Sequence, residues 1–179
     1  NSYSASIPHV IDADNGIIIE QAGHSVELIP LAGDFSHSSA KDNAIRFTEV
    51  FPGIDYQYTL VGTLIKEDIV LAHETEIPTL KTEIRHGAEL EVKEENGVVY
   101  VVDDSEESEP FLVMTAPVMV DSSGEISDAL TLRHELTSDK RDVITLVVDA
   151  EWLAGPERAY PVRIDPAIDV APSAVAVSC

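Results

Sequence analysis

The sequence predicts an all-β fold, a β-sandwich or a pair of sandwiches built from about a dozen short, mostly antiparallel strands. β-Prone runs recur with turn signals about ten residues apart, and no stretch keeps a 3.6-residue helical period over three turns. One hairpin is specified directly: Asn96-Gly97 joins Ala88–Lys93 to Val98–Val102. This dipeptide supplies the two positive φ angles of a type I′ turn.

Five strands are predicted before the hairpin, and two of them are joined by a turn at Pro52-Gly53, which fits the central positions of a type II turn. The five are Ile17–Ile19, Val26–Ile29, Ala44–Val50, Asp55–Val61 and Leu64–Leu71. The segment 30–43 is rich in Ser, Gly, Asp and Ala, and its length predicts a loop that is mobile or functional.

The strands predicted after the hairpin are Phe111–Ala116, Val118–Val120, Leu130–Leu136, Val143–Val148 and Tyr160–Ile164. Trp152, the single tryptophan, is expected to plug one end of the β-core. Pro161 and Pro166 cannot donate to a strand ladder, so the last strand is predicted to be an edge or closing strand.

Residues 1–168 are predicted to form the β-sandwich module, with a break near 78–87 if there are two lobes. Residues 169–179 are predicted to be a linker or the start of a further module. The only cysteine is Cys179, so no internal disulfide is expected. The polar start and this ending are typical of a fragment of a longer protein.

The net charge and the lack of a long apolar run argue against nucleic acid and against membrane insertion. Thirty-three acidic residues against 11 basic ones give a net charge of −22. Nucleic acid is not an expected partner, since phosphate contacts need clustered Lys and Arg. Membrane insertion is not expected either, because no apolar run approaches the roughly 20 residues that span a bilayer. An acidic, disulfide-free chain favours an extracellular or cell-wall location.

Catalytic patterns are weak. The six histidines show no metal-ligand spacing, and no nucleophile motif is present. A hydrolase that uses a carboxylate pair, or His24 and His37 beside the long loop, is the remaining enzyme hypothesis. A glycosidase would place two carboxylates in an aromatic-lined cleft, which so few aromatic residues do not predict.

Two ligand sites are candidates. Asp12 and Asp14 begin an oxygen-rich loop that ends at Gly16, but the calcium-loop spacing is one residue short and its distal Glu is absent, so a turn is the alternative. Tyr56, Tyr58 and Tyr100 are candidates for binding a cell-wall or host glycan if they form an exposed row. Core packing is the alternative for these aromatic residues.

Three stretches of the sequence resemble one family. They are Phe51–Tyr58 followed by Lys66–Leu71, then Ala116–Gly124, and finally Trp152–Pro166, which reads WLAGPERAYPVRIDP and is the most specific. Together they resemble the N-terminal β-rich region of Rhs (YD-repeat), wall-associated-protein-like polymorphic toxins of Gram-positive bacteria. The resemblance runs from about residue 44 to 168.

The resemblance implies a non-catalytic structural or interaction module, with toxic activity at the far C-terminus of the parent protein. It carries over no catalytic residue and no cofactor, and it implies that the partners are neighbouring modules of the same polypeptide. The sequence therefore predicts a protein that is not an enzyme, with a carbohydrate-binding module as the alternative and a hydrolase as a third hypothesis.

Overall fold

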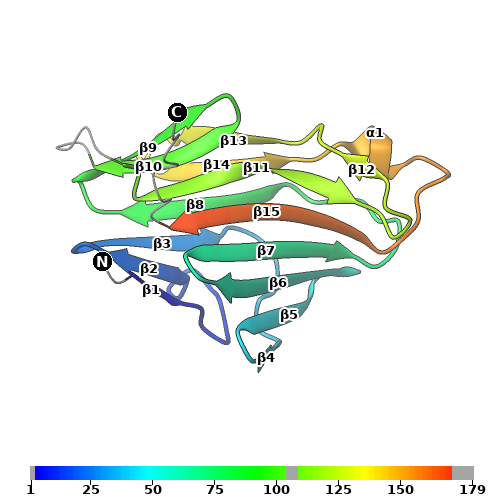
Figure 1. Ribbon diagram of the computed structural model, residues 1–179, viewed down its shortest axis with the longest axis horizontal. Coiled ribbons are helices and arrows are strands. Elements are labelled where there is room, and N and C mark those ends of the chain that lie inside the picture. Colours follow the sequence, from blue (N-terminus) through cyan, green and yellow to red (C-terminus); the bar gives the residue numbers. More distant parts are fainter. Residues whose placement is uncertain (1–2, 104–108, 171–179) are drawn as a thin grey trace, which may run out of the picture.

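The computed structural model describes residues 3–103 and 109–170, and these residues form fifteen strands and one short helix (Figure 1). The strands are β1 (Tyr3–Ser6), β2 (Ile17–Gln21), β3 (His24–Pro30), β4 (Ser38–Lys41), β5 (Ala44–Phe51), β6 (Ile54–Val61), β7 (Leu64–Leu71), β8 (Leu80–His86), β9 (Leu90–Glu95), β10 (Val98–Asp103), β11 (Leu112–Val120), β12 (Ile126–Ser127), β13 (Thr131–Leu136), β14 (Asp142–Val147) and β15 (Val162–Val170). The helix is α1 (Ala150–Leu153).

The strands make two antiparallel sheets, which confirms the predicted all-β sandwich. One sheet has six strands in the order β1-β2-β3-β8-β14-β13. The other has the order β4-β5-β6-β7-β15-β11-β10-β9, with β12 paired to β11. One buried hydrophobic cluster draws side chains from both sheets.

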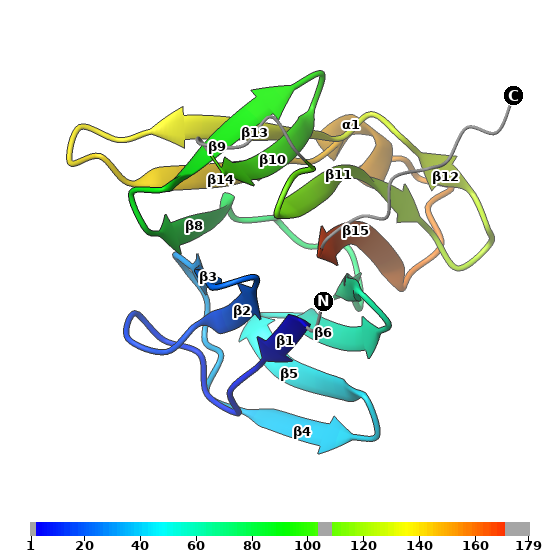
Figure 2. The ribbon, with the colours of Figure 1, turned by 60° about the vertical axis from the view of Figure 1, so that its left-hand side comes forward.

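The chain fills the two sheets in two halves, which we call the N-terminal lobe (β1–β7) and the C-terminal lobe (β8–β15). Each lobe contributes adjacent strands to both sheets, and the lobes lie edge to edge (Figure 2). Two strand pairings join them: β3 with β8, where Leu28 lies opposite Ile84, and β7 with β15, where Ile69 lies opposite Ile164. Strand pairing therefore joins the two lobes within each of the two sheets.

The predicted domain boundaries fall at two strands. Residues 80–86 of the predicted break form β8, which is hydrogen-bonded to β3 and β14, and the chain changes lobe just before it. The linker predicted from residue 169 starts inside β15, which runs to Val170. Residues 171–179, with Cys179, lie outside the described residues.

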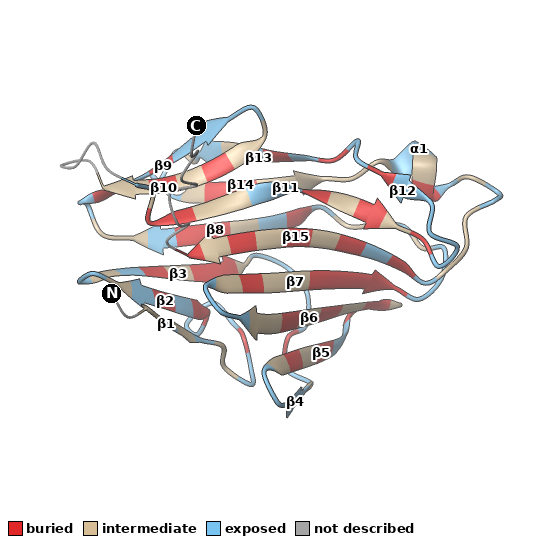
Figure 3. Cartoon of the chain, in the orientation of Figure 1, coloured by how far each residue is buried: buried red, intermediate tan, exposed pale blue. Residues whose placement is uncertain are grey.

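Alternation along the strands builds the core (Figure 3). In β15 every second residue is buried, from Val162 through Ile164 to Val170, while Arg163 between them is exposed. Successive side chains of a strand point to opposite faces, so one face of β15 meets the other sheet. Each fully buried aliphatic side chain contributes about 1.5–3 kcal/mol to stability.

The prediction that Tyr160–Ile164 lies at a sheet edge is wrong. β15 is an inner strand between β7 and β11. It tolerates its prolines because Pro161 precedes the strand, and Pro166 lies where the register with β11 shifts, between Thr115 and Val118. A proline at a ladder irregularity forfeits no regular hydrogen bond.

Two local expectations from the sequence also need revision. The segment 30–43 is not a simple loop, because it contains β4 and the buried Phe35, which bridges to Ile11. Trp152 is only partly buried at the edge of the core, and the buried residue of α1 is Leu153.

The two predicted turns are confirmed. Asn96 and Gly97 have φ values of 52° and 78°, as a type I′ turn requires, and Glu95 pairs with Val98 across the turn. Gly53 has a φ of 76° in the turn between β5 and β6.

Candidate functional site

Glu67 is the one charged residue on the inward face of β7. Ile65, Ile69 and Leu71 share that face and are buried, because residues two apart in a strand point the same way. Glu67 thus occupies a position that the pattern reserves for an apolar side chain. The alternation Ile-x-Glu-x-Ile was visible in the sequence, but the flanking charges Lys66 and Asp68 concealed it.

The neighbours of Glu67 across the sheet leave room beside it. Tyr58 of β6 lies directly opposite Glu67. On the other side, the pairs Ile164–Ile69 and Ile168–Ile65 place Pro166 opposite Glu67. Because proline has no N–H, no ladder bond forms from Pro166 at this point.

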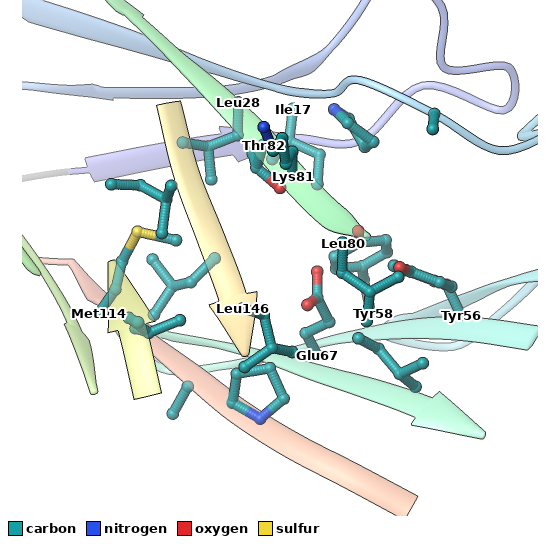
Figure 4. Close-up of a pocket in the computed structure, with 18 of the residues that line it drawn as sticks. Ile17, Leu28, Tyr56, Tyr58, Glu67, Leu80, Lys81, Thr82, Met114 and Leu146 are labelled. Carbon is teal, nitrogen blue, oxygen red and sulfur yellow. The ribbon is translucent and has the colours of Figure 1, made fainter. Parts of the chain in front are cut away.

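A cavity of about 60 Å³ lies between the two sheets at the junction of the lobes, and Glu67 lines it (Figure 4). Its carboxylate points away from β7, toward the space beside Leu80 and Leu146. Both lobes contribute to the wall. Its apolar members include Ile17, Leu28, Ile69, Leu80, Met114, Leu132, Ile144, Leu146 and Ile168.

Burial raises the pKa of Glu67 to about 7, although a hydrogen bond with Tyr58 favours the charged form and lowers it, and the nearby charge of Asp68 raises it further. Burial also raises the pKa of Tyr58 well above its ordinary value, and the charge of Glu67 adds to this effect. Glu67 keeps some accessible surface and is one of the residues that line the cavity. Functional sites often contain a carboxylic acid that changes charge near neutrality in mainly apolar surroundings.

This arrangement has clear chemical capabilities. Glu67 can accept or release one proton near pH 7, and in its ionised form it can hold a cation or a hydrogen-bond donor. Among the described residues, no lysine, arginine or histidine makes an ion pair with Glu67, whereas Lys66 on the other face of the strand pairs with Asp68 and Asp165.

A second polar centre closes the end of the sandwich near α1. Asp121 accepts hydrogen bonds from Ser123, Glu125 and Ala159, and it pairs with Arg158 at 3.2 Å. The hydrogen bond from the Ser123 hydroxyl, together with backbone N–H donors, lowers the pKa of Asp121 against the effect of burial.

Arg158 connects this carboxylate to the predicted plug. Its guanidinium carbon lies 3.6 Å from the centre of the Trp152 ring, and its Nε donates to the Trp152 carbonyl. Only 4% of the Arg158 side chain is exposed. The closing role predicted for Trp152 is therefore shared with the Arg158–Asp121 pair.

A third cluster lies across β8, β14 and β13. Asp142 accepts from Nε2 of His86 and from Nε2 of His134, each at 2.7 Å. Burial of His86 opposes its charged form, but hydrogen bonds to the Gly87 carbonyl and to Asp142 outweigh it and raise the pKa of His86. We expect this cluster to stabilise the fold at acidic pH.

His86→Gln tests this expectation. A raised histidine pKa contributes stability below the unfolded value of about 6.5 and loses it as pH rises through the folded value. The difference in free energy of unfolding between the wild type and His86→Gln should therefore be largest below pH 6 and shrink toward pH 9. Urea unfolding across this range measures it, and a difference that does not vary with pH would contradict the assignment.

The tyrosines predicted for glycan binding do not form an exposed row. Tyr56 and Tyr58 are buried, and their rings pack edge-on against Phe35 and Phe47 in the core. Tyr100, on β10, is partly exposed. Stacking on a sugar from solution needs accessible ring faces, so Tyr56 and Tyr58 are unsuited to it.

The calcium candidates lie in a self-contained turn. One carboxylate oxygen of Asp12 accepts hydrogen bonds from the backbone N–H of Asp14 and from Asn15, and Asp14 is exposed. Within residues 3–103 and 109–170 there is no group of three His, Cys, Asp or Glu side chains arranged to hold a metal ion. Calcium binding there stays a prediction.

The histidines of the hydrolase hypothesis have separate partners. His24 lies between Glu89 and Asp103, with its two ring nitrogens 3.3 and 3.0 Å from their carboxylates. His37 is exposed beside Asp34. Within the part of the chain that the structure describes, no contact brings His24 and His37 together.

Comparison with known proteins places this chain beside a set of large bacterial proteins. It is 32% identical over 137 residues to the tRNA nuclease WapA of Bacillus subtilis strain 168, which covers 73% of the chain and 6% of that protein. The same identity and coverage hold for the tRNA3(Ser)-specific nuclease WapA of Bacillus spizizenii. The chain is similar to a region of WapA.

A wall-associated protein of Geobacillus stearothermophilus is 28% identical over 114 residues, 61% of the chain and 43% of that protein. The resemblance to a wall-associated bacterial protein is thus confirmed at this level. The chain spans only 6% of the length of the WapA nucleases. No family model and no solved structure matches it.

These names overturn one prediction. The sequence predicted a protein that is not an enzyme, but three relatives of the chain are named tRNA nucleases. Residue patterns within the chain could not reveal this, because the similarity covers a small share of each nuclease.

In the described part of the chain, no helix has both the length and the apolar character needed to cross a membrane.

Proposed function

We propose that this chain is a structural and interaction module of a large secreted, wall-associated bacterial protein of the Rhs type that has tRNA nuclease activity. The observation that supports the proposal most directly is the 32% identity to WapA over 73% of the chain, within 6% of the relative. A segment of that proportion is one module among many. Neighbouring modules of the same polypeptide are its proposed partners.

The fold supports this role. The sheets are joined through both layers, so the module can hold its shape between other parts of a long chain. The acidic surface, with a net charge of −22, favours solubility outside the cell.

An antibody raised against the purified chain tests the location. Fractionation of the source cells should place the antigen in the cell-wall fraction, on a polypeptide far longer than 179 residues. A soluble cytoplasmic antigen of the size of this chain would refute the proposal.

The same antibody tests the activity. The immunopurified parent protein should cleave tRNA, since the relatives are named tRNA nucleases. The matched control is material purified identically from cells in which the gene is deleted. Intact tRNA in both samples would contradict the nuclease part of the proposal.

A further inference from the structure

Few ionisable side chains line the cavity at the lobe junction. Its wall is mainly apolar, and the titratable groups that line it are Glu67, Tyr56, Tyr58 and Lys81. Tyr56 and Tyr58 stay neutral, because burial raises the pKa of both. Lys81 is exposed at the rim. Among the described residues that line the cavity, Glu67 is therefore the only inward group that can carry a charge near neutral pH.

A buried carboxylate is costly without a cation beside it. Elsewhere in the molecule the pattern is different: buried Asp121 has Arg158, and buried Glu83 has Arg85 and Arg141. Glu67 has the hydrogen bond with Tyr58 and no ion pair among the described residues. The cavity beside it is the space in which a cation would fit.

We propose that this cavity binds a short alkylammonium group, with the nitrogen against the carboxylate of Glu67 and the carbon chain against Met114 and Leu146. The size of the group follows from the volume. A dry cavity of about 150 Å³ holds benzene, so one of about 60 Å³ holds roughly two to four non-hydrogen atoms. Free small amines and lysine side chains both carry this chemistry. This site goes beyond the module role and stands independently of it.

The two methionines of the chain give a direct assay. Met114 lines the cavity, whereas Met119 is fully buried and does not. In protein labelled with ¹³C at the methionine methyl groups, n-propylammonium should shift the Met114 signal saturably and leave Met119 unchanged. Met119→Leu assigns the two signals. The Kd should be on the order of 1 mM, since a ligand of four non-hydrogen atoms makes few contacts.

Matched probes separate charge from shape. n-Propanol, similar in size but uncharged, and acetate, with the same number of non-hydrogen atoms but the opposite charge, should leave Met114 unshifted at the same concentrations. Glu67→Gln keeps the shape of the side chain and should abolish the response to propylammonium. An Nα-acetyl-lysine amide tests the second source: a shift of Met114 with it alone assigns the site to lysine side chains, and a shift with propylammonium alone assigns it to free amines.

The response should also depend on pH. Ionised Glu67 is the binding form, and Asp68, on the opposite face of the strand, is the nearby charge that adds to burial in disfavouring it. Ionisation near pH 7 predicts about tenfold tighter binding at pH 8 than at pH 6. The proposal fails if neither propylammonium nor the lysine amide shifts Met114, or if propanol or the Glu67→Gln protein gives an equal response.

Discussion

Replacing Glu67 by leucine should remove a loss of stability that the wild type suffers as pH rises. Between pH 5 and pH 8, the free energy of unfolding of Glu67→Leu should increase by about 2–3 kcal/mol relative to that of the wild type. The pKa of Glu67 is raised from 4.5 to about 7 in the folded state. The folded protein therefore binds more protons than the unfolded chain in this window, and wild-type stability falls as pH rises through it. A shift of one pKa unit corresponds to about 1.36 kcal/mol.

Leucine removes this loss because it does not titrate. Leucine is larger than glutamate by about one methylene group, and the cavity beside residue 67 can take up this volume. Tyr58 loses a hydrogen-bond partner, which costs about 1–3 kcal/mol at every pH, so the pH dependence of the difference is the informative quantity. Glu67→Gln keeps a partner for Tyr58 and should show the same pH dependence. Urea unfolding at several pH values measures all three proteins.

Glu94→Gln is the control. Glu94 is exposed on β9, so its removal should leave the pH profile of stability unchanged. A parallel profile for the wild type and Glu67→Leu would show that Glu67 titrates normally. A costly carboxylate retained in a core is expected where a site needs it, because stability and function often conflict at such positions.

The fold class could be predicted from the sequence because the patterns that identify its turns and strands are local. Asn96-Gly97 fixes its turn through backbone geometry alone, and alternating residues identify β5 and β6. It was wrong about β15, since Pro166 is excluded from a regular ladder but not from an irregular one. The register between β15 and β11, which are far apart in the sequence, decides that Pro166 is tolerated, and no local sequence pattern shows that register.

The candidate site was missed for a related reason. Lys66, Glu67 and Asp68 are three consecutive charged residues in a predicted strand, and they alternate between the two faces of β7. Asp68 is also buried, on the other face, so only the contacts of Glu67 and Ile69 with the cavity between the sheets show which of the three points inward. The cavity itself depends on residues from both lobes, so it exists only after the lobes have paired.

Arg158→Ala should destabilise the protein by about 3–5 kcal/mol, the usual cost of breaking a buried ion pair by removing one partner. Asp121 would keep its hydrogen bonds but lose the cation 3.2 Å away. Trp152 would lose the guanidinium that covers its ring, a contact of about 0.5–2 kcal/mol when it is desolvated. Urea unfolding at pH 7 gives the change in free energy.

Arg133→Ala is the matched control. Arg133 is exposed on β13, and its loss should change stability by less than about 0.5 kcal/mol. Arg158→Lys separates charge from geometry: lysine keeps the positive charge near Asp121, but it cannot lie flat on Trp152 while donating to its carbonyl. A lysine variant as stable as the wild type would show that charge alone closes this end of the sandwich. An intermediate loss is expected, because the guanidinium joins Asp121, the Trp152 ring and the Trp152 carbonyl at once.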